Sequence, residues 1–261
     1  MKPGLSTLFL MGKPRCTMLN FIETHASECK AWELVDDGSL KLDERSIARL
    51  RQLSASFNLK FSLHAPFTDL NIASLNPTVQ RLSVKAFKAT MQKAYKVEAE
   101  TVVIHPGFKG PQEGFRPGES WQLNIKVLRQ LQAEAKNLGL TLALENMPKG
   151  GWPILSRVED FERFYAEADV EDLGLALDVG HALTVGQLDQ FLQKFSRRIV
   201  HIHLHSNYGD KDEHLGFGGG NLDWPGVITK LKEIGFSGFL MVEAIEKAYE
   251  SFQAVKRMVE G

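Results

Sequence analysis

The chain has 261 residues, of which 43% are hydrophobic and 24% charged, and its formal net charge is −1. This composition is ordinary for a soluble globular protein and excludes a disordered, low-complexity or fibrous chain. No apolar stretch approaches the ~20 residues of a membrane span. The small net charge excludes a global basic field for capturing nucleic acid, although not a local basic patch. Only Cys16 and Cys29 occur, so we expect two ordinary thiols in a reducing, cytoplasmic compartment.

Short apolar runs alternate with longer amphipathic stretches along the whole chain. The apolar runs predict β-strands near residues 5–10, 31–35, 60–64, 101–105, 140–144, 173–178, 199–205 and 238–243. Helical spacing of apolar residues predicts helices over 42–57, 77–97 and 120–138. The second of these begins at Pro77 and the third ends at Gly139, residues that favour a helix start and a helix end.

A strand followed by a helix, repeated eight times, implies parallel pairing of the strands. Together with the chain length, which is close to the roughly 250 residues of such folds, this repeat predicts an α/β fold, a (β/α)8 TIM barrel. No linker rich in proline, glycine or serine interrupts the chain, so we expect one domain over residues 1–261. An open doubly wound sheet is disfavoured because no glycine-rich phosphate loop follows the first strand, and because polar residues end six strands rather than two.

Histidines and carboxylates stand where predicted strands end and loops begin. These strand-end residues are His64, His105, Glu145, Asp178, His203 and Glu243, and His181, Asp212 and His214 follow just beyond. In a parallel barrel the carboxyl ends of all strands open on one face, where active sites are built. Imidazoles and carboxylates that converge there are the ligand types of a metal site.

Glu145 follows the apolar run TLAL, where an unpaired carboxylate would be costly to bury. A metal ion or a buried lysine or arginine would remove that cost, and the absence of basic residues at adjoining strand ends favours the metal. His201, His203 and His205 alternate, so they share one face of a strand. The alternation leaves open which of the three binds a metal.

Seven short motifs carry a resemblance to a known family, and they span nearly the whole chain. They are HAP, IHPG, LEN, LDVGHA, HLHSN, DEHLGFGGG and VEA. In these motifs the chain resembles the xylose isomerase-like barrel superfamily. That superfamily groups endonuclease IV (AP endonuclease family 2) with sugar and sugar-phosphate isomerases and epimerases.

The isomerases and epimerases of the superfamily hold a single Mn, Mg or Co ion. The resemblance implies that Glu145, Asp178, His203 and Glu243 would be its ligands here. It also implies that Glu145 and Glu243 form an acid–base pair across a carbon next to a carbonyl. The first hypothesis is therefore a metal-dependent isomerase or epimerase of a small sugar or sugar phosphate.

Endonuclease IV uses a larger ligand set that holds up to three zinc ions. By motif, that set corresponds here to His64, His105, Glu145, Asp178, His181, His203, Asp212, His214 and Glu243. The second hypothesis is therefore a multi-zinc phosphoester hydrolase acting on abasic-site DNA or on a small phosphoester. The loop VDDGSLKLDE argues against DNA, because Asp36 and Asp37 would repel phosphates and no arginine–aromatic cluster is present.

Two further loops carry residues that could hold a small phosphorylated or hydroxylated substrate. These residues are Lys109, Arg116, Lys149 and Trp152. Ordinary solvated loops would carry the same residue types. The third hypothesis is a non-catalytic protein that binds a metal or a carbohydrate and retains the barrel fold. No membrane partner is expected, and the sequence does not disclose the oligomeric state.

Overall fold

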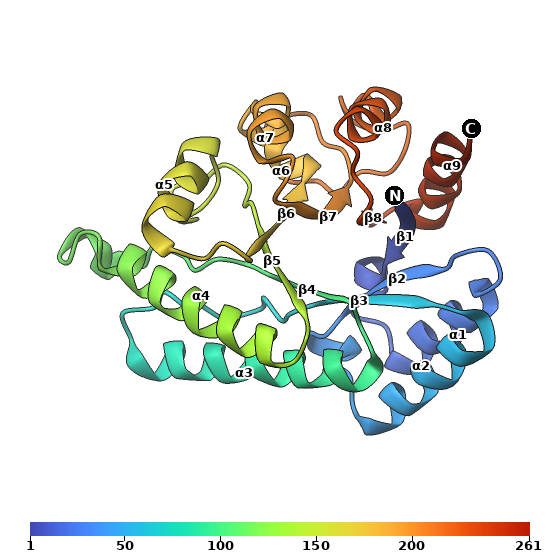
Figure 1. Ribbon diagram of the computed structural model, residues 1–261, viewed down its shortest axis with the longest axis horizontal. Helices are drawn as coiled ribbons and strands as arrows, with labels where there is room; N and C mark the ends of the chain where they lie inside the picture. The colour runs from blue at the N-terminus through green and yellow to red at the C-terminus, as the bar shows by residue number, and fades with distance from the viewer.

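Eight parallel strands close into a barrel in the order in which they occur along the chain (Figure 1). The computed structural model describes residues 1–261. The strands are β1 (Lys2–Ser6), β2 (Ala31–Val35), β3 (Lys60–His64), β4 (Thr101–Ile104), β5 (Thr141–Glu145), β6 (Gly174–Asp178), β7 (Ile199–Leu204) and β8 (Phe239–Val242). The ring closes between β1 and β8, where Lys2 pairs with Phe239 and Leu5 with Val242. The expected TIM barrel is therefore confirmed.

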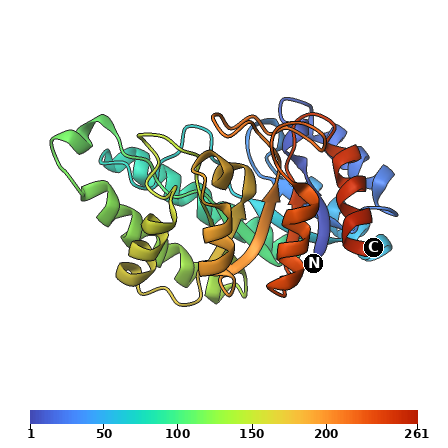
Figure 2. The same cartoon turned by 90° about the horizontal axis from the view of Figure 1, so that it is seen from above.

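Helices connect successive strands and cover the outside of the barrel (Figure 2). The α-helices are α1 (Arg15–His25), α2 (Glu44–Phe57), α3 (Pro77–Val97), α4 (Glu119–Asn137), α5 (Val158–Ala168), α6 (Val179–Thr184), α7 (Leu188–Phe195), α8 (Trp224–Glu233) and α9 (Ala248–Glu260). Three short 3₁₀ helices are η1 (Thr7–Leu10), η2 (Gly38–Leu40) and η3 (Pro111–Gly114). None of the helices combines the length and the apolar character needed to cross a bilayer.

The helices expected over 42–57, 77–97 and 120–138 form as α2, α3 and α4. A capping box begins α2: the Asp43 carboxylate accepts from the Ser46 N–H, and the Ser46 hydroxyl accepts from the Asp43 N–H, both at 2.8 Å. These bonds satisfy N–H groups that have no partner within the helix, so the start of α2 is fixed by local chemistry.

The first strand lies earlier than the sequence indicated. The prediction of a strand near 5–10 is wrong, because β1 ends at Ser6 and the apolar residues after it form η1. The Ser6 hydroxyl accepts a hydrogen bond from the Leu8 N–H at 3.4 Å, and the Met11 N–H bonds to the Leu8 carbonyl at 2.8 Å. A short apolar run fits a strand or a helical turn equally well, so periodicity could not separate them.

Apolar residues fill the space between the strands and the helices and also part of the barrel interior. One continuous core of 65 buried residues lies mainly between the strands and the surrounding helices. Two small clusters lie apart from that core, and they consist of Ala31, Phe239 and Met241, and of Val103, Ala143 and Ala176. A barrel packed in this way is a solid core that holds its strand ends rigidly.

The two aspartates after β2 are held by contacts within the protein. Asp36 is buried and pairs with the Lys93 ammonium at 2.8 Å, and the Thr90 hydroxyl donates to it at 2.5 Å. Asp37 accepts from the backbone N–H groups of Phe67 and Thr68 in the next loop, at 3.1 and 2.8 Å. Lys93 therefore balances the charge of Asp36, so the expectation that Asp36 would repel phosphates is wrong. Asp37 keeps its negative charge, and its repulsion of phosphates stays a prediction.

Candidate metal centre

The strand-end histidines and carboxylates meet at one end of the barrel. His64, Glu145 and Asp178 are the last residues of β3, β5 and β6, and Glu243 follows β8 directly. All of these side chains are buried, with relative exposures of 4% or less. Parallel strands bring their carboxyl ends to one face, so residues far apart in sequence share one site.

Four of these residues form a compact central group. Glu145, Asp178, His203 and Glu243 each offer one ligand atom, and these four atoms lie within 4.8 Å of one another. The Nδ1 atom of His203 lies 3.4 Å from a Glu145 oxygen, 3.4 Å from a Glu243 oxygen and 3.7 Å from an Asp178 oxygen. This nitrogen is buried and makes no hydrogen bond. Three carboxylates around one unpaired imidazole nitrogen form a donor set that suits a divalent cation.

A second group shares Glu145 with the first. The Nε2 atoms of His64 and His105 lie 3.2 and 3.3 Å from Oε2 of Glu145, whereas Oε1 of Glu145 faces His203. Each oxygen of this one carboxylate therefore faces a different set of nitrogens. The geometry is that of a carboxylate able to bridge two cations.

A third group lies beside the first, on helix α6 and on the segment that follows β7. The Nε2 atoms of His181 and His214 lie 3.0 and 3.2 Å from the same oxygen of Asp212. Nδ1 of His181 bonds to the Asn146 carbonyl at 2.7 Å, and Nδ1 of His214 bonds to the Glu243 carbonyl at 2.8 Å. These backbone contacts orient both rings, so their Nε2 atoms point toward Asp212.

The protonation balance of the site reflects the pairing of its imidazoles with carboxylates. Burial lowers the pKa of His105. At His64, His181 and His214, hydrogen bonds and charges of neighbouring carboxylates outweigh the effect of burial. They raise the pKa of His64 to about 9, of His181 to about 10 and of His214 to about 9. Burial alone would raise the pKa of Glu145, but the surrounding imidazoles hold it well below its usual range. Positive charge is required here, and protons or divalent cations can supply it.

The structure separates the three alternating histidines that the sequence left open. His203 belongs to the central group, and His205 lies in the third group with Nε2 3.0 Å from an Asp178 oxygen. His201 lies deeper, with Nε2 2.9 Å from a Glu33 oxygen. Sequence reasoning left His205 as one of three alternatives and missed Glu33, which lies with His201 and His203. A carboxylate inside the apolar run AWELV was the available signal for Glu33.

A cavity of about 440 Å³ opens above the three groups. Its polar walls are His64, His105, Glu145, His181, Asp212, His214 and Glu243, and its apolar walls are Leu8, Phe9, Met11, Phe67, Met147, Pro148 and Ile245. No lysine, arginine, serine, threonine, asparagine or glutamine lines it. The cavity therefore offers acidic and imidazole groups on one side and an apolar wall on the other.

The four loop residues considered for substrate binding do not line this cavity. Lys149 forms an ion pair with Asp210 at 2.7 Å, and Arg116 pairs with Glu119. Trp152 is 57% exposed, and its carbonyl accepts from the Lys109 N–H at 2.7 Å. A role of these residues in substrate binding stays a prediction.

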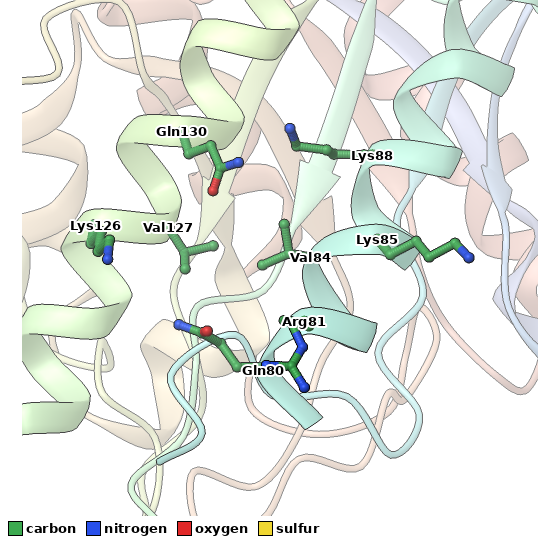
Figure 3. A pocket seen from close by; sticks show the side chains of 8 residues that line it. All are labelled: Gln80, Arg81, Val84, Lys85, Lys88, Lys126, Val127 and Gln130. Carbon is green, nitrogen blue, oxygen red and sulfur yellow. The ribbon is translucent and has the colours of Figure 1, made fainter. Parts of the chain in front are cut away.

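Another hollow lies on the outer surface, between α3 and α4 (Figure 3). Its walls are Gln80, Arg81, Val84, Lys85, Lys88, Lys126, Val127 and Gln130. Lys88 forms an ion pair with Glu134 at 3.4 Å, and the Lys85 ammonium points away from the hollow. The hollow contains no carboxylate or imidazole, so it lacks the acid–base groups found at the barrel mouth.

Comparisons with known proteins agree with this arrangement. The xylose isomerase-like TIM barrel family matches residues 21–259. An uncharacterised protein of Methanocaldococcus jannaschii is 32% identical over 265 residues, covering 100% of this chain and 90% of that protein. A probable endonuclease 4 of Symbiobacterium thermophilum is 26% identical over 216 residues, covering 77% of this chain and 76% of that protein. The crystal structure of a D-tagatose 3-epimerase-like protein is 32% identical and superimposes with a TM-score of 0.91, covering 100% of this chain and 97% of that one.

Proposed function

Because this chain belongs to the xylose isomerase-like TIM barrel family, we propose that it is a metal-dependent epimerase or isomerase of a small, uncharged sugar. One observation carries the proposal: two carboxylates of the compact central group, Glu145 and Glu243, line the cavity, and Asp178 and His203 lie buried directly behind them. The similarity to a D-tagatose 3-epimerase-like protein over the whole chain supports the same reaction class.

The central group fits a divalent cation. Glu145, Asp178, His203 and Glu243 would hold it, since their ligand atoms lie within 4.8 Å of one another. No lysine or arginine pairs with any of these carboxylates. Burying three carboxylates without a cation would be costly, and an oxygen-rich set with one nitrogen suits Mn²⁺, Mg²⁺ or Co²⁺.

The two glutamates of the central group would carry the proton transfer. A bound cation would polarise the substrate carbonyl and stabilise the negative charge that develops on its oxygen. One glutamate takes the proton from the carbon next to the carbonyl, and the electron pair of that C–H bond moves toward the carbonyl oxygen. The other glutamate returns a proton to the opposite face of the same carbon, so its configuration inverts. Glu145 and Glu243 are the two candidates, because both line the cavity.

The lining of the cavity favours a neutral sugar over a sugar phosphate. No lysine or arginine lines it, whereas Glu145, Asp212 and Glu243 do. A phosphate group carries roughly two negative charges, which would lie next to these carboxylates. The imidazoles of the lining already face Glu145 or Asp212, and the apolar residues offer no hydrogen-bond donor, so a phosphate would find no free cationic partner.

The direct test is proton exchange on a panel of simple ketoses. The purified protein, loaded separately with Mn²⁺, Mg²⁺, Co²⁺ or Zn²⁺, is incubated with each sugar in D2O and followed by NMR and sugar chromatography. We expect deuterium to enter next to the carbonyl together with an epimeric or isomeric product. No exchange with any sugar at full metal loading would reject the proposal.

Matched variants locate the chemistry within the site. Glu145→Gln and Glu243→Gln keep the shape of each side chain and remove the base, so exchange is expected to fall by at least about 100-fold. Glu246→Gln is the control, because Glu246 is an exposed carboxylate on the loop that carries Glu243. Equal loss of activity in all three variants would contradict the assigned roles.

Phosphoester hydrolysis is the second candidate, and the three neighbouring ligand groups favour it. Glu145 faces both the second group and the central group, and Asp212 lies between two imidazoles of the third. Several cations held this closely can stabilise both the attacking and the leaving oxygen of a phosphoester. The partial similarity to endonuclease 4 points the same way.

Metal content separates the two candidates. About three zinc ions per chain by elemental analysis, with nicking of an abasic-site duplex, would establish hydrolysis. About one Mn²⁺, Mg²⁺ or Co²⁺ per chain, with sugar conversion and no nicking, would establish the epimerase or isomerase.

A further inference from the structure

A carboxylate lies inside the barrel, below the central group, and the proposed reaction does not use it. Glu33 is on β2, its side chain is fully buried, and it does not line the cavity. No lysine or arginine approaches it, since its closest charged neighbours are the imidazoles of His201 and His203. Burying a carboxylate without a lysine or arginine partner costs free energy. The contacts that Glu33 does make therefore indicate its role.

Glu33 makes one directed hydrogen bond, and that bond goes to His203. The distance from Oε2 of Glu33 to Nε2 of His203 is 3.0 Å, with hydrogen-bond geometry. The distance to Nε2 of His201 is 2.9 Å, but this nitrogen forms no directed hydrogen bond. The other oxygen of Glu33 has no partner. The Glu33 carboxylate therefore faces Nε2 of His203, on the side of the ring away from the central group.

The near side of that ring faces the central group. Nδ1 of His203 has no hydrogen-bond partner and lies 3.4 Å from oxygens of both Glu145 and Glu243. A neutral imidazole carries its proton on one nitrogen and a lone pair on the other. A carboxylate that accepts from Nε2–H keeps the proton there, which leaves the lone pair on Nδ1.

We propose that Glu33 is a positioning residue: it accepts the Nε2–H of His203, fixes the ring tautomer and presents Nδ1 to the divalent cation. This assignment rests on the proposed metal site, and it adds a residue outside the four ligands. Histidine ligands are commonly oriented by a carboxylate on their other nitrogen, and loss of such a partner typically weakens metal binding about 10–100-fold.

The packing around Glu33 argues against a role in stability alone. Apolar groups such as Ala143, Phe239 and Met241 occupy much of the barrel interior around it. An apolar residue at position 33 would avoid the cost of burying a carboxylate but would leave the Nε2–H of His203 without an acceptor, so these two effects on stability oppose each other. Metal affinity has no such compensation, so it is expected to fall whichever way stability changes when Glu33 is replaced.

The test uses the full-length protein and divalent metal alone, without a sugar. Mn²⁺ and Zn²⁺ affinities are measured by chelator competition for the wild type, Glu33→Gln, Glu33→Leu and Ser62→Ala. Ser62 is the matched control, because it is the register partner of Glu33 on β3 and its buried hydroxyl makes no hydrogen bond. We expect affinity to fall about 10–100-fold for both Glu33 variants and to stay unchanged for Ser62→Ala.

A second measurement reads the tautomer directly and does not depend on activity. In ¹⁵N-labelled, Zn²⁺-loaded wild type, long-range ¹H–¹⁵N correlation should show Nε2 of His203 protonated and Nδ1 ligated. A protonated Nδ1 would overturn the assignment even if a Glu33 variant failed to fold. Unchanged metal affinity in folded Glu33→Gln would overturn it and leave the proposed function standing. A wild-type protein that binds no divalent cation would overturn both.

Discussion

Gly180 allows the His205 ring to occupy its place in the third ligand group. A Cβ atom built on Gly180 would lie 2.0, 2.4 and 2.6 Å from three atoms of that ring. Ordinary carbon contacts need about 3.5 Å, so the nearest ring atom would have to move by roughly 1.5 Å. His205 is fully buried and lies 3.0 Å from an Asp178 oxygen, which leaves it little room to move.

Two opposing effects set the size of the change in Gly180→Ala. Gly180 lies in α6 with an ordinary helical backbone, so alanine gains about 1 kcal/mol from helix propensity. Overpacking against the buried ring costs about 1–3 kcal/mol. The single substitution should therefore lower the free energy of unfolding by up to about 2 kcal/mol. In a His205→Ala background the ring is absent, and the same substitution should become stabilising by up to about 1 kcal/mol.

Urea denaturation of the wild type, both single variants and the double variant, all stripped of metal, measures this change of sign. The coupling free energy should be about 1–3 kcal/mol. Similar m-values across the four proteins would show that the unfolding transition itself is unaltered. If Gly180→Ala had the same effect in both backgrounds, the steric argument would be refuted.

Three further predictions concern aspartates on the loops and their partners. Lys93→Met removes the ammonium group beside buried Asp36 and should lower the free energy of unfolding, measured by urea denaturation, by about 3 kcal/mol. Adding Asp36→Asn to this variant should recover part of that loss. Additive effects of the two substitutions would contradict the pairing. Burial would raise the pKa of Asp37, but hydrogen bonds from backbone N–H groups of the next loop hold it lower than usual. The stability that ionised Asp37 contributes to the fold is therefore fully present above about pH 4 and is lost as the pH falls further. The melting temperatures of the wild type and of Asp37→Asn should therefore converge in acid. Lys149 pairs with Asp210 and does not line the cavity, so Lys149→Ala should leave the KM for a sugar within about twofold, and a tenfold rise would show that it reaches substrate.

Most of the candidate site could be predicted from sequence because each residue of the central group stands in or next to a recognisable strand. His64, Glu145 and Asp178 follow buried apolar runs, and a parallel barrel brings such ends together whatever their separation along the chain. The alternation of strands and helices also gives the order of the strands around the barrel without further information. The fold and most of the central group therefore follow from local patterns.

Depth within the barrel could not be predicted in the same way. His201, His203 and His205 share one strand face, and period-2 alternation gives the face but not the height at which each residue meets its neighbours. That height depends on the stagger of the strands around the barrel. Glu33 shows the same limit, because the histidine that it bonds lies 170 residues away and no local pattern links the two.

Loop residues escaped prediction for a different reason. Leu8 lies after the true end of β1 and lines the cavity, whereas Lys109 and Arg116 lie on loops that do not line it. Loop direction depends on turns and caps such as the Ser6 hydroxyl bond, and not on a repeating pattern of side chains. Basic residues in a loop are therefore weak indicators of a binding site.

Glu145 divides its two oxygens between two sets of nitrogens, and cations bound at both sets would therefore influence each other. A cation bound through one oxygen withdraws electron density from the other, so each ion weakens the binding of its neighbour by the same factor. Loading would then proceed in steps of decreasing affinity. The concentration of available metal would set how many ions the barrel carries, and the same polypeptide could change its chemistry with its ionic surroundings.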